Sequence, residues 1–138
     1  MDEDKAVPPA PESMDEEHRI QLALLGALSE ALRTAQAGTR PGEILEQLKE
    51  YSGAHFISEQ LLMRLSAYPG YEAHMADHGA LMEGLQRLCQ RLAAGEPLES
   101  RDTHAIRAQL LYHIGNRDRV FLDYYAQWLS QGAGTHPG

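Results

Sequence analysis

The sequence predicts an all-α fold, an antiparallel up-down-up-down four-helix bundle. Four stretches of the chain place apolar residues three and four positions apart, which is the spacing of one helix face. Short segments with glycine and proline separate these stretches, and no segment reads as a strand. A chain of 138 residues suits one domain and is long enough to bury a hydrophobic core.

The first helix is expected from about Met14 to Thr34. Ser13 and Glu16 have the spacing of a capping box at its start. Residues 1–12 contain prolines among charged side chains and are predicted to be a disordered tail. The inner face of the helix is expected to carry His18, Leu22, Leu25, Leu28 and Leu32.

The second helix is expected from about Pro41 to Ser66. Pro41 suits the first turn of a helix, because the N–H that proline lacks would have no helical partner there. The sequence Tyr68-Pro69-Gly70 predicts a turn after this helix. The inner face is expected to carry Leu48, Tyr51, His55, Glu59 and Leu62.

The third helix is expected from about Tyr71 to Ala94, where Gly95 and Pro97 end it. Its inner face is expected to carry His74, His78, Leu81, Leu85, Cys89 and Leu92. The fourth helix is expected over about 100–130, with Ser100 as a candidate N-cap. Its inner residues include Ile106, Leu110, His113, Phe121 and Trp128.

The charge and composition of the chain narrow the classes of partner. The formal net charge is −8, so nucleic acid and anionic membrane surfaces are not expected partners, because both are recognised by basic faces. No apolar stretch approaches the ~20 residues that span a bilayer, and the N-terminal segment lacks the features of a signal peptide. Cys89 is the only cysteine, which favours a reducing compartment. The expected location is the cytoplasm.

Polar residues interrupt the apolar faces of all four expected helices. His55 and Glu59 are four residues apart, as are His74 and His78, and this spacing puts each pair on one helix face. In antiparallel neighbours, residues equidistant from the connecting turn lie at the same height. By this comparison seven side chains converge on one layer: His18, His55, Glu59, His74, His78, His113 and Asp118.

This layer has two possible interpretations. A single histidine on an inner face is usually a hydrogen-bonded core residue. Five imidazoles and two carboxylates in one layer are costly to desolvate, whereas bound cations would compensate them directly. Seven donors are too many for one tetrahedral zinc ion and suit two metal ions that share carboxylates. Mixed imidazole and carboxylate ligands favour iron.

Other residues serve as internal controls. His104 is nine residues before His113, about 180° round the helix, and is expected to face solvent. His136 lies near the C-terminus and is not expected to bind metal. Cys89 is expected to be a small core residue rather than a ligand.

One spacing departs from α-helical geometry. His113 and Asp118 are five residues apart, which puts them about 140° apart on an ideal α-helix. If both bind metal, either Asp118 reaches sideways or the helix widens locally into a π-bulge.

Four segments of the chain resemble the signature of the hemerythrins, and of bacterial hemerythrins in particular. These segments are DEEHR (15–19), YSGAHFISEQLLM (51–63), YPGYEAHMADH (68–78) and HIGNRD (113–118). The family pattern is a first histidine followed by HxxxE, HxxxH and HxxxxD, and all seven positions are filled in order. The resemblance covers roughly residues 14–130, and a hemerythrin-like domain is expected over 13–131, followed by a loose tail over 132–138.

The resemblance implies two iron ions with a bridging oxo or hydroxo group, and dioxygen as the ligand. It assigns His74, His78 and His113 to one iron and His18 and His55 to the other. Glu59 and Asp118 would bridge the two ions. The iron with fewer protein ligands would keep an open position for dioxygen.

The resemblance also marks four candidate residues of the dioxygen pocket: Gln21, Phe56, Gln109 and Ile114. Phe56 and Ile114 match apolar positions of the family. Gln21 and Gln109 stand where the family usually has apolar residues. Two interpretations stay open: both amides turn to neighbouring helices or solvent, or one of them touches the bound ligand or a gating water.

Reversible binding of dioxygen, for transport, storage or sensing and without catalysis, is the function that the resemblance implies. One alternative is a di-iron enzyme that reduces nitric oxide or peroxide. Another is a signalling module whose surface changes with oxygen or redox state. No particular protein partner is predicted.

Overall fold

A computed structural model of the chain describes residues 11–34 and 41–132, with the backbone alone at 11–13. The expected tails, at 1–12 and 132–138, therefore lie almost wholly outside the described residues. The helices are α1 (Pro11–Thr34), α2 (Pro41–Leu65), α3 (Tyr71–Ala93), α4 (Ser100–His113), the π-helix η2 (Ile114–Asp118) and α5 (Arg119–Ser130). The described part of the chain contains no strand, which confirms the predicted all-α class.

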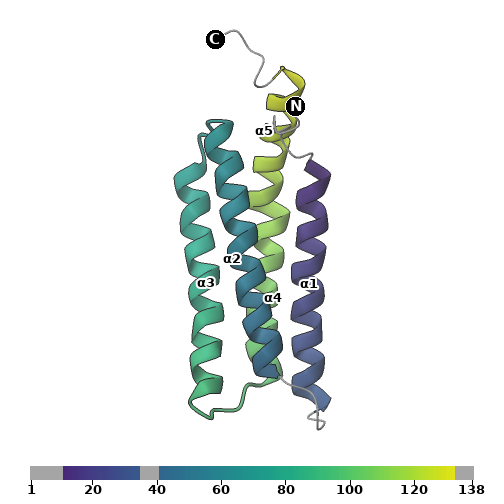
Figure 1. Ribbon diagram of the computed structural model, residues 1–138, viewed down its shortest axis with the longest axis vertical. Helices are drawn as coiled ribbons and strands as arrows, with labels where there is room; N and C mark the ends of the chain where they lie inside the picture. The colour runs from purple at the N-terminus through teal and green to yellow at the C-terminus, as the bar shows by residue number, and fades with distance from the viewer. Residues whose placement is uncertain (1–10, 35–40, 133–138) are drawn as a thin grey trace, which may run out of the picture.

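The helices form an antiparallel bundle of four rods. Figure 1 shows α1, α2, α3 and the continuous rod of α4, η2 and α5 side by side along the long axis. α1 packs against α2 and α4, and α3 packs against the same two helices. Successive rods therefore run in opposite directions, as the sequence predicted. No helix among the described residues is long and apolar enough to cross a membrane.

Two helix starts differ from the prediction. α1 begins at Pro11, so Ser13 lies inside the helix and the capping box predicted there is wrong. A proline stabilises the first turn of a helix, which explains the earlier start. The N-cap of α4 is Glu99 rather than Ser100, which is the first helical residue. The backbone N–H of Glu99 donates to Oδ2 of Asp102 at 2.8 Å, so the cap forms one residue earlier than expected.

Gly95 ends α3, as predicted. It has a φ of 85°, in the left-handed region that favours glycine. Its N–H and that of Glu96 donate to carbonyl groups in the last turn of α3, at 3.0 and 2.8 Å. This pair of bonds is the Schellman arrangement, which satisfies carbonyl groups that the helix leaves without partners.

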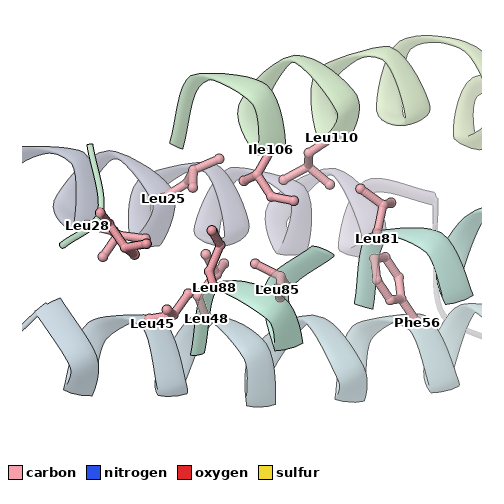
Figure 2. Packing of buried hydrophobic residues seen from close by; sticks show 11 residues of the cluster. Leu25, Leu28, Leu45, Leu48, Phe56, Leu81, Leu85, Leu88, Ile106 and Leu110 are labelled. Atoms are coloured by element: carbon pink, nitrogen blue, oxygen red, sulfur yellow. The ribbon is translucent and has the colours of Figure 1, made fainter. Parts of the chain in front are cut away.

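Buried apolar side chains form two clusters. The large cluster contains Leu25, Leu28, Leu45, Leu48, Phe56, Leu81, Leu85, Leu88, Leu98, Ile106 and Leu110. Figure 2 shows its side chains pointing from the surrounding helices into a common interior. The small cluster contains Met14, Leu62, Met63, Phe121, Leu122 and Tyr125.

A polar layer separates these two clusters. Along α1, Met14 belongs to the small cluster and Leu25 to the large cluster, with His18 between them. The last rod repeats this order in reverse, because His113 lies between Leu110 and Phe121. The two apolar clusters therefore hold the polar layer from both sides and fix its depth in the bundle.

Candidate metal centre

The seven side chains predicted to bind metal all lie in this polar layer. Each of them is at most 4% exposed. They come from every rod of the bundle: His18 from α1, His55 and Glu59 from α2, His74 and His78 from α3, His113 from α4 and Asp118 from η2. The residues that the sequence predicts at one depth in the bundle are therefore close in space.

The donor atoms of these residues fall into two overlapping sets. One set contains Glu59, His74, His78, His113 and Asp118, and the other contains His18, His55, Glu59 and Asp118. Within each set the donor atoms lie within 4.8 Å of one another. Glu59 and Asp118 belong to both sets, so each carboxylate faces two groups of imidazoles.

Glu59 is the central carboxylate of α2. Its Oε1 lies 2.8 Å from Nε2 of His78 and 3.2 Å from Nε2 of His74. Its Oε2 lies on the side of the other set, 3.8 Å from Nε2 of His18 and 3.9 Å from Nε2 of His55. The two oxygens of one carboxylate thus face different donor sets.

Asp118 completes both sets from the last rod. Its Oδ1 lies 2.7 Å from Nε2 of His74 and 3.0 Å from Nε2 of His113, and its Oδ2 lies 2.9 Å from Nε2 of His18. Asp118 is the last residue of the π-helix η2. Of the two remedies expected for the five-residue spacing, the local widening of the helix is therefore confirmed.

The hydrogen-bonding state of the layer tests whether these residues fit bound metal. Ten buried side-chain nitrogen and oxygen atoms in the described part of the chain have no hydrogen-bond partner, and nine of them belong to the seven residues. Each such atom costs about 1–3 kcal/mol when it stays unsatisfied. Imidazole nitrogens and carboxylate oxygens are ligands of transition metals, so this buried cluster fits bound cations.

The charge balance of the layer supports the same conclusion. Burial lowers the pKa of His18 and His74, but the close approach and negative charge of Asp118 and Glu59 outweigh burial and raise each pKa to about 9. Burial raises the pKa of both carboxyl groups, and the surrounding histidines lower it well below its ordinary value. Burial keeps the pKa of His78 below its ordinary value. Two carboxylates in this layer therefore require positive charge, which protons supply when no metal is bound.

Polar side chains outside the layer contact the outer nitrogens of three histidines. Nδ1 of His55 lies 2.5 Å from Oε1 of Glu17, and the amide of Gln60 lies 3.0 Å from Nδ1 of His78. A partner on the outer nitrogen fixes the orientation of an imidazole and points its other nitrogen inward.

Asp77 approaches the third of these histidines. Its Oδ2 lies 3.5 Å from Nδ1 of His113 and forms an ion pair with Nε of Arg117 at 2.6 Å. The sequence pattern did not predict a role for Asp77, Glu17 or Gln60. A usable signal was present, because each of the three directly precedes or follows a predicted ligand and therefore lies at the edge of an inner face.

The four candidate pocket residues do not share one cavity. Gln21 and Phe56 line a cavity together with Ser52 and with leucine and isoleucine side chains. Gln109 is exposed and lines a separate cavity with Asp77, His113 and Arg117. Ile114 is partly buried against the large cluster.

The internal controls behave as expected where they are described. His104 is exposed, and Cys89 is partly buried against the large cluster. His136 lies outside the described residues.

Several bacterial proteins are similar to this chain over most of its length. Bacteriohemerythrin from Stenotrophomonas maltophilia (strain R551-3) is 27% identical over 89% of this chain and 80% of its own. Bacteriohemerythrin from Methylococcus capsulatus is 30% identical over 78% of this chain and 82% of its own. Bacteriohemerythrin from Pseudomonas aeruginosa is 24% identical, over 86% and 76% respectively. No solved structure matches the chain significantly.

A family description covers the whole of the candidate centre. The sequence pattern of the hemerythrin family, described as the hemerythrin HHE cation binding domain, matches residues 10–125. This range includes all seven clustered residues, the first three rods and the last rod as far as Tyr125. The chain belongs to the hemerythrin family.

Proposed function

We propose that this protein binds dioxygen reversibly at a centre of two iron ions, as an oxygen carrier, store or sensor rather than as an enzyme. The observation that carries the proposal is the pair of buried donor sets that share Glu59 and Asp118. Membership of the hemerythrin family supports a di-iron, oxygen-binding type of function. The similar proteins named bacteriohemerythrin support it further.

The donor sets suggest which residues would hold each ion. His74, His78 and His113 would hold one iron, and His18 and His55 the other. Glu59 and Asp118 would bridge the two, because each belongs to both sets. The set with His18 and His55 supplies one histidine fewer, which would leave room for a small ligand on an ion held there. When bound, the iron pair supplies the electrons for reversible binding of dioxygen.

The surrounding residues would keep water away from this position. The ring of Phe56 stacks on His78 with centroids 4.0 Å apart and lies 5.6 Å from the ring of His55. The ring also lines the cavity described above. A dry pocket slows the loss of electrons and protons to solvent, which favours release of the ligand unchanged.

The test is oxygenation of the iron-loaded protein. The reduced protein is prepared without oxygen, exposed to air and then returned to vacuum, while its visible absorption is followed. We expect an absorption that appears in air, disappears under vacuum and survives repeated cycles. His78→Ala should abolish the signal, and His104→Ala, which changes an exposed histidine, should leave it intact.

Other outcomes would favour the alternative functions. Rapid irreversible oxidation, with turnover of added nitric oxide or peroxide, would contradict the proposal and favour an enzyme. Oxygen-dependent capture of a protein partner, together with reversible binding, would identify the sensor among the three roles.

A further inference from the structure

We propose that the amide of Gln21, held in place by Ser52, hydrogen-bonds a small polar ligand bound beside His18 and His55. The ligand class is water or a small anion such as azide. Gln21 and Ser52 together would give the pocket a preference for polar ligands over apolar ones. The inference deepens the proposed function and rests on it for the identity of the neighbouring ion.

Gln21 and Ser52 lie one helical turn from the two histidines. Gln21 follows His18 by three residues on α1, and Ser52 precedes His55 by three on α2. Because these helices are antiparallel neighbours, both offsets point in the same direction along the bundle. The rings of His18 and His55 are 4.9 Å apart, so Gln21 and Ser52, one helical turn further along the bundle, are also expected to be close.

A direct hydrogen bond joins this second pair. Nε2 of Gln21 donates to Oγ of Ser52 at 2.9 Å, across 31 residues of sequence. Both side chains are 1% exposed. Ser52 therefore fixes one end of a buried amide that water does not reach from the surface.

The other end of the amide has no partner. Oε1 of Gln21 is buried and makes no hydrogen bond within the described part of the chain. It is the single atom of this kind that does not belong to the seven clustered residues. The Ser52 hydroxyl both donates and accepts, so turning the amide round would still leave one polar end unsatisfied.

Gln21 also lines a small cavity next to the metal centre. The cavity has a volume of about 10 Å³, roughly the space of one water molecule. Gln21 and Ser52 are its polar residues, and apolar side chains from all four rods form the rest. Phe56 also lines it, and Figure 2 shows this ring beside Leu81 at one end of the large cluster.

Contacts of Phe56 join this cavity to the metal centre. Its ring touches the rings of His55, His78 and His113. A ligand bound at the His18 and His55 side would therefore lie between the carboxylates of the metal centre and a cavity whose polar lining residues are Gln21 and Ser52. A polar ligand gains a hydrogen bond there, and an apolar ligand leaves the amide unpaired.

The first experiment uses the zinc-loaded protein, which is diamagnetic and holds neither iron nor dioxygen. Nuclear Overhauser effects between bound water and the side-chain amide protons of ¹⁵N-labelled Gln21 report a long-lived internal water. We expect this contact in the natural protein and its reduction in Ser52→Ala, where the amide loses its anchor. Absence of any water contact at Gln21 would overturn the inference, whatever the oxygen experiment shows.

The second experiment measures azide affinity of the oxidised, iron-loaded protein. Gln21→Met keeps an unbranched side chain of similar length and removes both polar groups, and should weaken azide binding about fivefold. Ser52→Ala should weaken it in the same direction. Adding Ser52→Ala to Gln21→Met should change nothing further, because the serine acts through the amide.

A matched control uses an exposed glutamine of α3. Gln90→Leu should bind azide as the natural protein does. Iron content and the unfolding midpoint are measured for every variant, so that loss of metal is separated from loss of the hydrogen bond. Unchanged azide affinity in an iron-loaded, folded Gln21→Met protein would overturn the inference.

Discussion

Nε2 of His113 lies 3.0 Å from Oδ1 of Asp118, although the two residues are five positions apart on one continuous rod. An unbroken α-helix would hold them about 140° apart. The π-helix η2 turns Asp118 back into the bundle, and Nδ2 of Asn116 donates to the carbonyl of Tyr112 within the widened turn. The π-helical turn therefore places the Asp118 carboxylate in the polar layer.

The position of Asp118 predicts the effect of neutralising it. Asp118→Asn keeps the size of the side chain but removes a charge that both donor sets share, so iron content should fall to one ion per chain or fewer. Helix content measured by circular dichroism should stay the same. Asp123→Asn, an exposed change on α5, is the control and should keep its iron. Full iron loading of Asp118→Asn would contradict the assignment of this residue.

The contact between Glu17 and His55 predicts a selective loss of metal. Glu17→Gln weakens the partner that orients His55, and such changes typically lower metal affinity about 10- to 100-fold. A chelator titration should release one ion early and leave the ion beside His74, His78 and His113 in place. Glu16→Gln, next in sequence but paired with Arg19 on the surface, should titrate as the natural protein does. Equal weakening of both ions would argue against a local role.

The sequence predicted the bundle and the polar layer because both depend on helical periodicity. Spacing along each helix and distance from each turn are enough to place His18 opposite Glu59. Contacts that depend on side-chain reach between helices, such as that of Gln60 with His78, are not set by periodicity. The exposure of Gln109 is likewise not set by periodicity, because it depends on how α4 is rotated relative to its neighbours.

Helix ends were the least predictable part of the fold. The caps at Ser13 and Ser100 were expected because serine is a frequent N-cap residue. Proline at the start of α1 and the mutual contact of Glu99 and Asp102 at α4 stabilise earlier starts. The free energies of these alternative helix starts differ by only about 1 kcal/mol, and the sequence pattern alone does not resolve so small a difference.

The positive φ of Gly95 predicts opposite effects for two glycine substitutions. Gly95→Ala should lower the free energy of unfolding by about 1 kcal/mol, because a Cβ is strained at a φ of 85°. Gly26→Ala lies inside α1, where an added Cβ meets nothing within 4 Å, and should raise it by about 0.5–1 kcal/mol. Urea denaturation of the two variants gives both values. Equal signs for the two changes would be inconsistent with the backbone described here.

The start of α4 predicts a pH-dependent contribution to stability. Nη1 of Arg91 donates to Asp102 at 2.8 Å, and this bond and that from the Glu99 N–H lower the pKa of the Asp102 carboxyl. A carboxyl group with a lowered pKa stabilises the folded protein above its unfolded pKa, and this contribution is lost as the pH falls through the folded pKa. Asp102→Asn should therefore cost about 1 kcal/mol at pH 7.

The comparison across pH gives the sign of this effect. The difference in unfolding free energy between the natural protein and Asp102→Asn should stay constant from about pH 7 to pH 5 and shrink below about pH 4. Glu83→Gln, an exposed change on α3, should show no such trend. A difference that grows as the solution becomes more acidic would have the wrong sign.

The iron content of the folded protein tests the central claim most directly. The metal-free chain is loaded with ferrous iron in the absence of oxygen, freed of excess metal and analysed for iron and protein. Two donor sets that share Glu59 and Asp118 predict two iron ions per chain. A folded protein that retains no iron, or only one ion however much is supplied, would contradict the account.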